Sequence, residues 1–261
     1  FLAGAQDNGV HQLNGAGLTS SVEVTGGDGA FVHIDEDEPQ YQFGSYVRSQ
    51  YRRSTNNGAN WSSVNYSTSI GLFINPTDYD DVNNNFYGAW SAGSYLRWLN
   101  ASSSTSGFAN SVAAFAGGTA SFVGVSKFTA NTVYFGTTNG KIVKVDNANT
   151  GTITETDITG SSMSASNVSC VAQGTTTNNL LATFSNYGST HVWVSTSGGG
   201  AAGWTNISGN IPDIPVRWAM FYPDDNTQAI LATEMGIFET SLINGASTNW
   251  VLNTSFPTVK T

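Results

Sequence analysis

Residues 220–250 read MFYPDDNTQAILATEMGIFETSLINGASTNW, and this stretch decides the fold. One apolar segment ends at the polar turn Pro223-Asp224-Asp225, a second surrounds Leu231-Ala232-Thr233, and a third is Gly236-Ile237-Phe238-Glu239-Thr240. A longer polar segment then leads to Trp250. Short runs rich in β-branched and aromatic residues, bounded by turn residues, are typical of β-strands. The stretch therefore predicts a unit of four strands joined by turns.

The central part of this unit recurs along the chain. Copies that place apolar or aromatic residues before Gly or Thr lie 40 to 50 residues apart, at Leu2-Ala3-Gly4, Gln42-Phe43-Gly44, Phe86-Tyr87-Gly88, Tyr134-Phe135-Gly136, Leu181-Ala182-Thr183 and Leu231-Ala232-Thr233. A four-stranded sheet cannot cover both of its faces alone, and stacking such sheets radially buries each face on a neighbour. We therefore predict an all-β chain that folds as a β-propeller of four-stranded antiparallel blades. A β-sandwich is less suitable, because it would not repeat one four-strand signature.

The repeat divides the chain into blades of similar length. We expect a single propeller domain over residues 1–261, with blades at approximately 19–66, 67–110, 111–160, 161–209 and 210–261, and with residues 1–18 as the end of a preceding blade. A closed ring of seven such blades needs about 320 residues. We therefore expect an incomplete ring in this chain. The chain also starts at Phe1 without an initiator Met or a signal peptide, which favours a piece of a longer polypeptide.

The composition is polar but poor in charge. Charged residues make up 10% of the chain, against about 25% in a typical soluble domain, and the net charge is −9. Nucleic acid is therefore not expected as a partner, because a polyanion would be repelled and no basic stripe offsets this. The single cysteine, Cys170, cannot form an intrachain disulfide, and we predict a buried thiol within a strand. The sequence contains no run of 18 apolar residues, so it predicts no transmembrane helix.

Two turns carry a related motif. The stretch Ser54-Thr55-Asn56-Asn57-Gly58-Ala59-Asn60-Trp61 follows the pattern Ser-x-Asp-x-Gly-x-x-Trp with Asn56 at the Asp position, and residues 195–204 follow it with Ser197 there and the Trp displaced. Residues 240–250 form a longer, degenerate third copy. A short polar side chain caps the amides of such a turn, and Gly permits a positive φ. We therefore predict structural roles for Ser54, Asn56, Gly58, Trp61, Ser195, Ser197, Gly199 and Trp204.

This pattern resembles the Asp-box of BNR repeat β-propellers. Gln6-Asp7-Asn8-Gly9 followed by Gly26-Gly27-Asp28-Gly29 resembles a pairing seen in sortilin-like and xyloglucanase-like (glycoside hydrolase family 74-type) propellers. It looks especially like large surface proteins of Bacteroidetes that are exported by type IX secretion. The resemblance implies a secreted or cell-surface protein, located outside the cell and forming part of a larger polypeptide or surface assembly.

A binding or adhesion module is the first functional hypothesis. Aromatic rings stack on sugar rings, and uncharged amides can hydrogen-bond to hydroxyl groups. The candidate ligand contacts on a propeller face are Tyr46, Trp90, Tyr95, Trp98 and Tyr187. Packing within the blades is the alternative role for these side chains. We expect a carbohydrate or protein ligand at a propeller face.

A glycoside hydrolase is the alternative hypothesis, and we favour binding over catalysis. This chemistry needs two carboxyl groups across a cleft, about 5–5.5 Å apart for retention or about 6.5–9.5 Å apart for inversion. The resemblance to xyloglucanase-like enzymes implies that Asp28, in its Gly-flanked turn, matches one catalytic Asp. Asp7 is a second candidate acid. Either residue could instead brace its own loop.

The acidic runs Asp35-Glu36-Asp37-Glu38 and Asp78-Tyr79-Asp80-Asp81 offer oxygen ligands suited to Ca²⁺. Neither run has the Gly and Glu positions of an EF-hand loop, and both follow a strand where the repeat expects a polar turn. We therefore expect solvated turns, no metal site and no cofactor.

Overall fold

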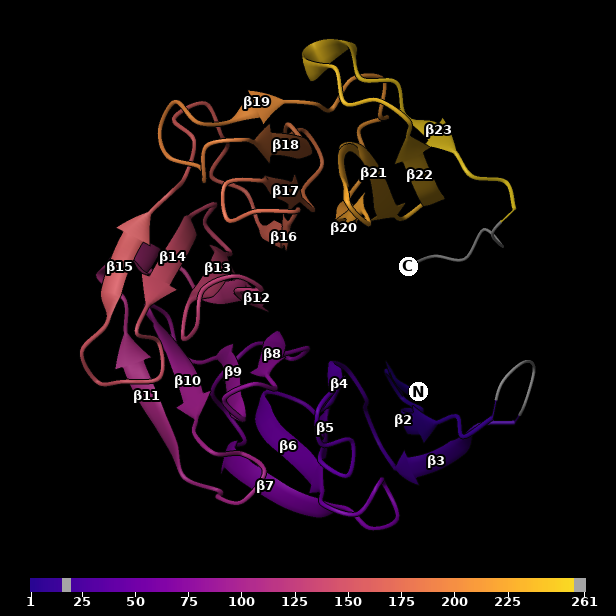
Figure 1. Cartoon of the computed structure of the whole chain (residues 1–261), viewed down its shortest axis with the longest axis vertical. Coiled ribbons are helices and arrows are strands. Elements are labelled where there is room, and N and C mark those ends of the chain that lie inside the picture. Colours follow the sequence, from indigo (N-terminus) through magenta and orange to yellow (C-terminus); the bar gives the residue numbers. More distant parts are fainter. Residues whose placement is uncertain (16–19, 256–261) are drawn as a thin grey trace. The chain divides into compact units, whose positions relative to one another are not determined.

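The computed structural model describes residues 1–15 and 20–255. These residues form 23 strands and two short 3-10 helices, η1 (Ala113–Phe115) and η2 (Gly245–Ser247), as drawn in Figure 1. No helix in this part of the chain is long and apolar enough to cross a membrane. The chain divides into two compact units, Phe1–Val112 and Ala113–Thr261.

The first unit contains three antiparallel sheets. The first sheet has three strands, β1 (Leu2–Ala5), β2 (Gly9–Gln12) and β3 (Val22–Thr25). The second consists of β4 (Val32–Ile34), β5 (Gln42–Ser45), β6 (Ser49–Ser54) and β7 (Ser62–Ser67). The third consists of β8 (Thr77–Asp80), β9 (Asn85–Ala89), β10 (Ser94–Trp98) and β11 (Gly107–Ser111).

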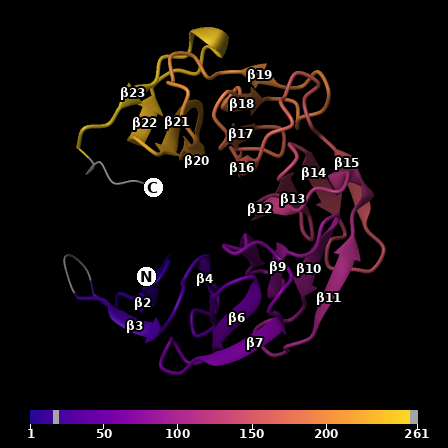
Figure 2. The same cartoon turned by 180° about the vertical axis from the view of Figure 1, so that it is seen from behind.

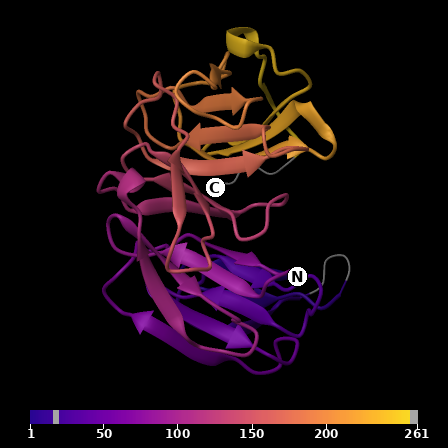
Figure 3. The same ribbon diagram turned by 60° about the vertical axis from the view of Figure 1, so that its left-hand side comes forward.

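The second unit contains three four-stranded antiparallel sheets. The first consists of β12 (Ala120–Val125), β13 (Val133–Thr137), β14 (Ile142–Asp146) and β15 (Thr154–Asp157). The second consists of β16 (Val168–Gln173), β17 (Leu180–Phe184), β18 (Val192–Ser195) and β19 (Thr205–Asn206). The third consists of β20 (Val216–Tyr222), β21 (Asp225–Thr233), β22 (Gly236–Thr240) and β23 (Val251–Leu252). Strands pair in chain order, and the first strands of successive sheets are neighbours. Figures 2 and 3 show the same succession of sheets within the unit from other sides.

The predicted four-stranded antiparallel sheet is confirmed in five of the six sheets of the described residues. All six sequence signals lie in strands, namely β1, β5, β9, β13, β17 and β21. The expected boundary between residues 18 and 19 falls within residues 16–19, which lie outside the described residues. Strand β3 pairs with β2, so Val22–Thr25 belong to the first sheet and not to the blade expected from residue 19 onward.

The core explains why these sheets stack. Leu180 and Leu181 are adjacent in β17 and both are fully buried, yet they pack into different apolar clusters. Leu180 packs with residues of β12–β18, such as Phe122, whereas Leu181 packs with residues of β18–β22, such as Leu231. Successive side chains of a strand point to opposite faces. The β16–β19 sheet therefore buries one apolar face on the preceding sheet and the other on the following sheet.

Cys170 lies in β16 and belongs to the first of these clusters. Its thiol is buried, and burial raises its pKa to about 12. A thiol with such a pKa is not a nucleophile near neutral pH. The prediction of a buried structural cysteine is therefore confirmed.

Candidate functional site

Two of the predicted ligand contacts are core residues, and their prediction as binding residues was wrong. Trp98 is fully buried, with its ring centroid 5.5 Å from that of Phe43 and 5.4 Å from that of Phe86. Its indole Nε1 donates a hydrogen bond of 2.7 Å to the Ser104 carbonyl. Tyr95 is also fully buried, and its hydroxyl accepts a hydrogen bond from the Asn110 amide. Neither ring has a face that a ligand could reach.

The other three aromatic candidates remain predictions. Tyr46 and Trp90 are half-buried; the Arg52 guanidinium lies 5.3 Å from the Tyr46 ring centroid, and Trp90 packs against the aromatic core of its unit. Tyr187 is 63% exposed, and its hydroxyl donates to Glu234 Oε2 at 2.9 Å. Each ring therefore already has a partner within its own unit.

The two Gly-flanked turns that carry Asp7 and Asp28 lie side by side. Asp28 Oδ1 accepts a hydrogen bond of 3.0 Å from the backbone N–H of Asp7, and the Gly29 N–H donates to the Ala5 carbonyl at 2.9 Å. Asp7 has a φ of 62°, a conformation that needs support from its surroundings in a non-glycine residue. The Asp28 carboxylate thus braces the neighbouring turn that carries Asp7, whereas the alternative considered above was a brace of its own loop.

Two carboxyl groups of the second unit, Asp157 and Asp225, have lowered pKa values. A general acid in a glycosidase needs a raised carboxyl pKa. Burial alone would raise the pKa of Asp157, but hydrogen bonds from Lys141 and Thr159 outweigh it and lower that pKa. Hydrogen bonds from the Thr227 hydroxyl and amide, with a weaker one from Gln228, lower the pKa of Asp225. Both groups are therefore better suited to remain charged than to donate a proton.

The two acidic runs line one pocket of about 260 Å³ in the first unit, together with His33. The buried Asp35 carboxylate is already occupied, because it accepts bonds from the Asp37 and Glu38 amides and from the Tyr79 hydroxyl. Burial lowers the pKa of His33 to about 4, so its imidazole stays neutral beside these carboxylates. Residues 1–15 and 20–255 contain no group of three or more His, Cys, Asp or Glu side chains arranged to hold a metal ion.

The first hairpin that resembles an Asp-box has a closed network of hydrogen bonds. Ser54 Oγ accepts bonds from the amides of Gly58 and Asn56, and Asn56 Oδ1 accepts from the Asn60 amide at 2.9 Å. Trp61 Nε1 donates to the Gly58 carbonyl at 3.0 Å, and Gly58 has a φ of 80°. The polar groups of the motif are therefore used within the turn.

The other two copies connect sheets. Ser195 Oγ accepts bonds from the amides of Ser197 and Gly199, in the same way as Ser54. Trp204 Nε1 donates to the Ile158 carbonyl of the preceding sheet at 2.7 Å, and Trp250 Nε1 donates to the Ile207 carbonyl at 2.8 Å. These indoles thus tie the β16–β19 sheet and the β20–β23 sheet each to the sheet before it in the second unit.

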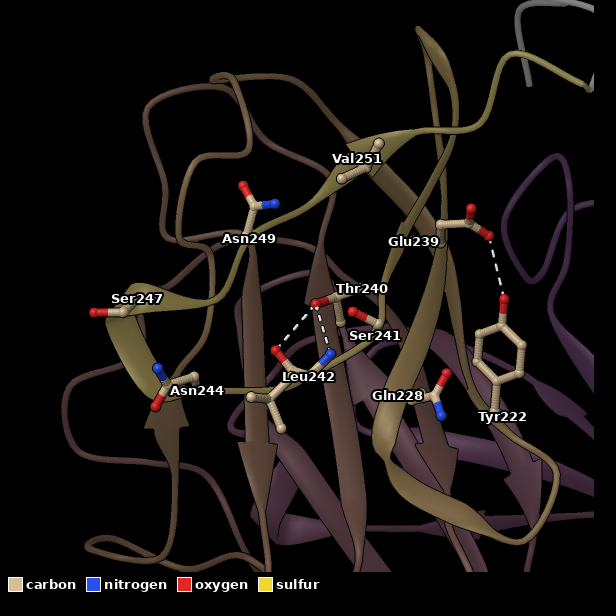
Figure 4. Close-up of a pocket in the computed structure, with 10 residues that line it drawn as sticks. All are labelled: Tyr222, Gln228, Glu239, Thr240, Ser241, Leu242, Asn244, Ser247, Asn249 and Val251. Atoms are coloured by element: carbon tan, nitrogen blue, oxygen red, sulfur yellow. Dashed lines mark hydrogen bonds between the residues drawn. The ribbon is translucent and has the colours of Figure 1, made fainter.

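The pocket drawn in Figure 4 lies on the last sheet and has a volume of about 390 Å³. It is lined by Tyr222, Gln228, Glu239, Thr240, Ser241, Leu242, Asn244, Ser247, Asn249 and Val251. Strands β20, β21 and β22 position Tyr222, Gln228 and Glu239, and the segment from Ser241 to β23 supplies the other wall. Of the lining side chains, Glu239 is the only one that carries a charge, and it is negative.

Some side chains of this pocket are held by hydrogen bonds within the protein, and others make none. The Tyr222 hydroxyl donates to Glu239 Oε2 at 3.2 Å, and the Asn253 amide donates to the same oxygen at 3.3 Å. The bond to Glu239 raises the pKa of Tyr222, so the hydroxyl stays protonated. The exposed side chains of Ser241, Asn244, Ser247 and Asn249 make no hydrogen bond with any residue of the described part of the chain. Four neutral groups can therefore both donate to and accept from a ligand here.

None of these lining residues was predicted as a site residue from the sequence. The available signal was the extra length of the third Asp-box-like copy, which spans residues 240–250. In the structure, these extra residues include η2 and form the outer wall of the pocket. The interpretation of that copy as a degenerate structural hairpin did not predict this pocket.

No protein-family model matches this chain, and no curated protein matches it. Its structure is similar to YCF48 from Cyanidioschyzon merolae, with a TM-score of 0.64 and 14% identity over 88% of this chain and 75% of that one. It is also similar to the Pan2 WD40 domain of Neurospora crassa (TM-score 0.64, 11% identity, 97% of this chain and 76% of that one). The chain folds as a β-propeller.

A glycoside hydrolase family 74 xyloglucanase from Xanthomonas campestris is a further similar structure. The TM-score is 0.60 at 15% identity, and the match covers 81% of this propeller but 36% of the enzyme. Identities this low establish the fold and not the activity. The predicted fold class is therefore confirmed, whereas the function has to be argued from the sites of this propeller.

Proposed function

We propose that this propeller is a non-catalytic binding module whose pocket on the last sheet takes a neutral carbohydrate. The observation that carries the proposal is the set of four uncommitted amide and hydroxyl side chains around the pocket, Ser241, Asn244, Ser247 and Asn249. A sugar presents hydroxyl groups that donate and accept, which matches these side chains. The exposed Leu242 and Val251 offer apolar contact for the C–H faces of the ring.

The charge of the site sets the expected selectivity. Glu239 faces the pocket, and the whole chain carries a net charge of −9. This negative charge would therefore repel an acidic sugar, whereas it would not lower the affinity for a neutral sugar. Tyr222 and Asn253 hold the Glu239 carboxylate in place, so it can accept bonds from sugar hydroxyls without rearranging.

Titration with neutral hexasaccharides tests this proposal. We expect calorimetry to show binding of at least one of cellohexaose, xylohexaose and mannohexaose. The expected dissociation constant is near 0.1 mM, which corresponds to a binding free energy of about −5.5 kcal/mol. Replacing both Asn244 and Asn249 by Ala should weaken binding about tenfold, because each lost hydrogen bond costs roughly 0.5–1.5 kcal/mol. Asn60→Ala, an exposed amide in the other unit, is the matched control and should bind as the wild type does.

Hexagalacturonate completes the test as a charged probe. It should bind more weakly than the neutral hexasaccharides, and Glu239→Gln should narrow that difference. Equal affinities of the wild type and the Asn244→Ala/Asn249→Ala variant, or no heat with any neutral hexasaccharide, would contradict the proposal.

A protein ligand is the second candidate, and an exposed apolar patch favours it. Phe128, Trp218 and Met220 are 45%, 42% and 47% exposed, and Phe128 and Met220 line a pocket of about 350 Å³. The Trp218 ring packs on the buried Phe122, with the ring centroids 5.5 Å apart. Aromatic and Met side chains are enriched in the cores of protein interfaces. A YCF48 structure with a bound D1 peptide is among the similar folds, which supports a peptide-binding role for this propeller.

Selection from a random 12-residue peptide library tests this second candidate. We expect peptides with aromatic or aliphatic residues to be enriched on the wild-type protein. A Trp218→Ser/Met220→Ser variant should bind them at least tenfold more weakly, because the apolar anchor contacts are lost. The exposed Met235 lies outside this patch, so Met235→Ser is the control. Peptides that bind both variants as well as the wild type would argue against the patch as a docking surface.

The proposal includes an extracellular, cell-surface location and membership of the BNR/Asp-box propellers, with a resemblance to the type IX-secreted surface proteins of Bacteroidetes. The hydrogen-bonded hairpins at Ser54 and Ser195 support the Asp-box part of it. The low fraction of charged residues supports a display or adhesion role outside the cell.

A further inference from the structure

The sequence contains five Asn-Gly dipeptides, and such a dipeptide can rearrange in water. They are Asn8-Gly9, Asn14-Gly15, Asn57-Gly58, Asn139-Gly140 and Asn244-Gly245. The glycine amide nitrogen gives up its proton to solvent and attacks the side-chain Cγ of the Asn, so that a new N–C bond closes a succinimide ring and the side-chain nitrogen takes up a proton and leaves as ammonia. Water then opens the ring at either carbonyl carbon and leaves aspartate or isoaspartate in place of the neutral Asn. Glycine favours the attack because it has no Cβ to obstruct it.

In three of these dipeptides the fold holds the glycine in place. The Gly58 N–H donates to Ser54 Oγ at 2.9 Å, and the Gly140 N–H donates to the Thr137 carbonyl at 3.2 Å. Gly9, Gly58 and Gly140 are buried, and a Cβ at each would lie 2.0, 2.1 and 2.5 Å, respectively, from an atom of another segment. Ring closure requires the glycine amide to turn toward Cγ, and neighbours this close oppose that movement.

The dipeptide Asn244-Gly245 has different surroundings. Asn244 is exposed and precedes η2, and its side chain makes no capping hydrogen bond. The Ser247 amide donates to the Asn244 carbonyl at 3.0 Å, whereas the Gly245 N–H donates to no residue of the described part of the chain, as is usual for the first amides of a helix. A Cβ at Gly245 would meet only the Thr205 Cγ2 methyl group, at 3.9 Å. The reacting amide therefore has space to move, and the single turn of η2 around it can open at low cost.

We propose that Asn244 is a site of spontaneous deamidation, which changes the charge of the pocket on the last sheet. Asn244 lines this pocket, where Glu239 is the only charged lining side chain (Figure 4). Conversion of Asn244 to aspartate or isoaspartate adds a second negative charge and removes an amide donor. The reaction needs no ligand, so it does not depend on sugar binding; a change in sugar affinity after the reaction rests on the function proposed above.

Incubation of the native protein at mildly alkaline pH, followed by proteolysis and mass spectrometry, tests this inference. Each deamidated peptide gains about one dalton. We expect the peptide that contains Asn244 to convert at least tenfold faster than those that contain Asn57 and Asn139, because the fold restrains only the latter two. The matched control is the same protein unfolded in urea. All three sites are Asn-Gly there, so their rates should agree within about threefold.

A variant separates the reaction at Asn244 from other routes to an acidic form. Gly245→Ala keeps the Asn side chain but obstructs the attacking nitrogen, and it should slow the conversion of Asn244 at least tenfold in urea, where the fold has no influence. Equal rates at Asn57, Asn139 and Asn244 in the native protein would overturn the inference, because the fold would then select no site. Conversion of Asn57 or Asn139 ahead of Asn244 would also overturn it, because the turn at η2 would then protect its amide better than the hairpins protect theirs.

Discussion

Replacing Trp98 by alanine is expected to lower the free energy of unfolding by about 3–5 kcal/mol. The ring is fully buried among Phe43, Tyr51 and Phe86. An alanine methyl group is too small to fill the volume that the ring occupies. The substitution also leaves the Ser104 carbonyl without the 2.7 Å hydrogen bond from the indole. Urea denaturation followed by near-ultraviolet circular dichroism measures the loss.

Tyr187→Ala is the matched control for Trp98→Ala. Both residues were predicted from the sequence as ligand contacts, but Tyr187 is 63% exposed. Its replacement should change the free energy of unfolding by no more than about 0.5 kcal/mol, as is usual for surface sites. Similar losses for the two variants would show that Trp98 does not have the core position described above.

Gly29→Ala is expected to destabilise the first unit by about 3 kcal/mol. A Cβ at residue 29 would lie 2.0 Å from the Gly9 carbonyl oxygen and 2.9 Å from the Ala5 nitrogen. Both contacts are with backbone atoms that cannot move without opening the β1–β2 hairpin and the adjoining turn. The cost therefore comes from forced separation of the two Gly-flanked turns.

Gly26→Ala, three residues earlier in the same motif, is the control for this effect. A Cβ there would meet only the end of the Glu23 side chain, at 3.0 Å, and that side chain can rotate away. We expect a change below about 1 kcal/mol in the same denaturation experiment. If Gly29→Ala were as stable as Gly26→Ala, the two turns would not be in contact.

The repeat could be predicted to within about one residue, but the orientation of its side chains could not. The predicted copies align Gly44, Gly88 and Gly136, and all three lie in strands. Yet a Cβ at Gly44 or Gly88 would meet Val10 or Tyr51 of the preceding sheet, whereas one at Gly136 would meet Val168 of the following sheet. A shift of one residue reverses the face to which a side chain points. The spacing of a motif therefore locates a strand without assigning its faces.

The same limitation explains the errors at the candidate site. Whether an aromatic residue such as Trp98 or Tyr187 is buried depends on which sheet covers its face, and that sheet is distant in sequence. The pocket at Glu239 was missed because its walls come from three strands and a lengthened turn that have no shared motif.

The sequence by itself determined the class of this protein: alternating short apolar runs, turn residues and a period of 40 to 50 residues suffice for an all-β propeller. These features are local or repetitive, so they can be read without knowing what packs against what. Only the tertiary structure decided that Asp28 braces a turn, that Trp98 lies in the core, and that Tyr222, Gln228 and Glu239 line one pocket. Those outcomes depend on contacts between residues tens of positions apart, where the physical environment of a side chain is set by the stacking of sheets.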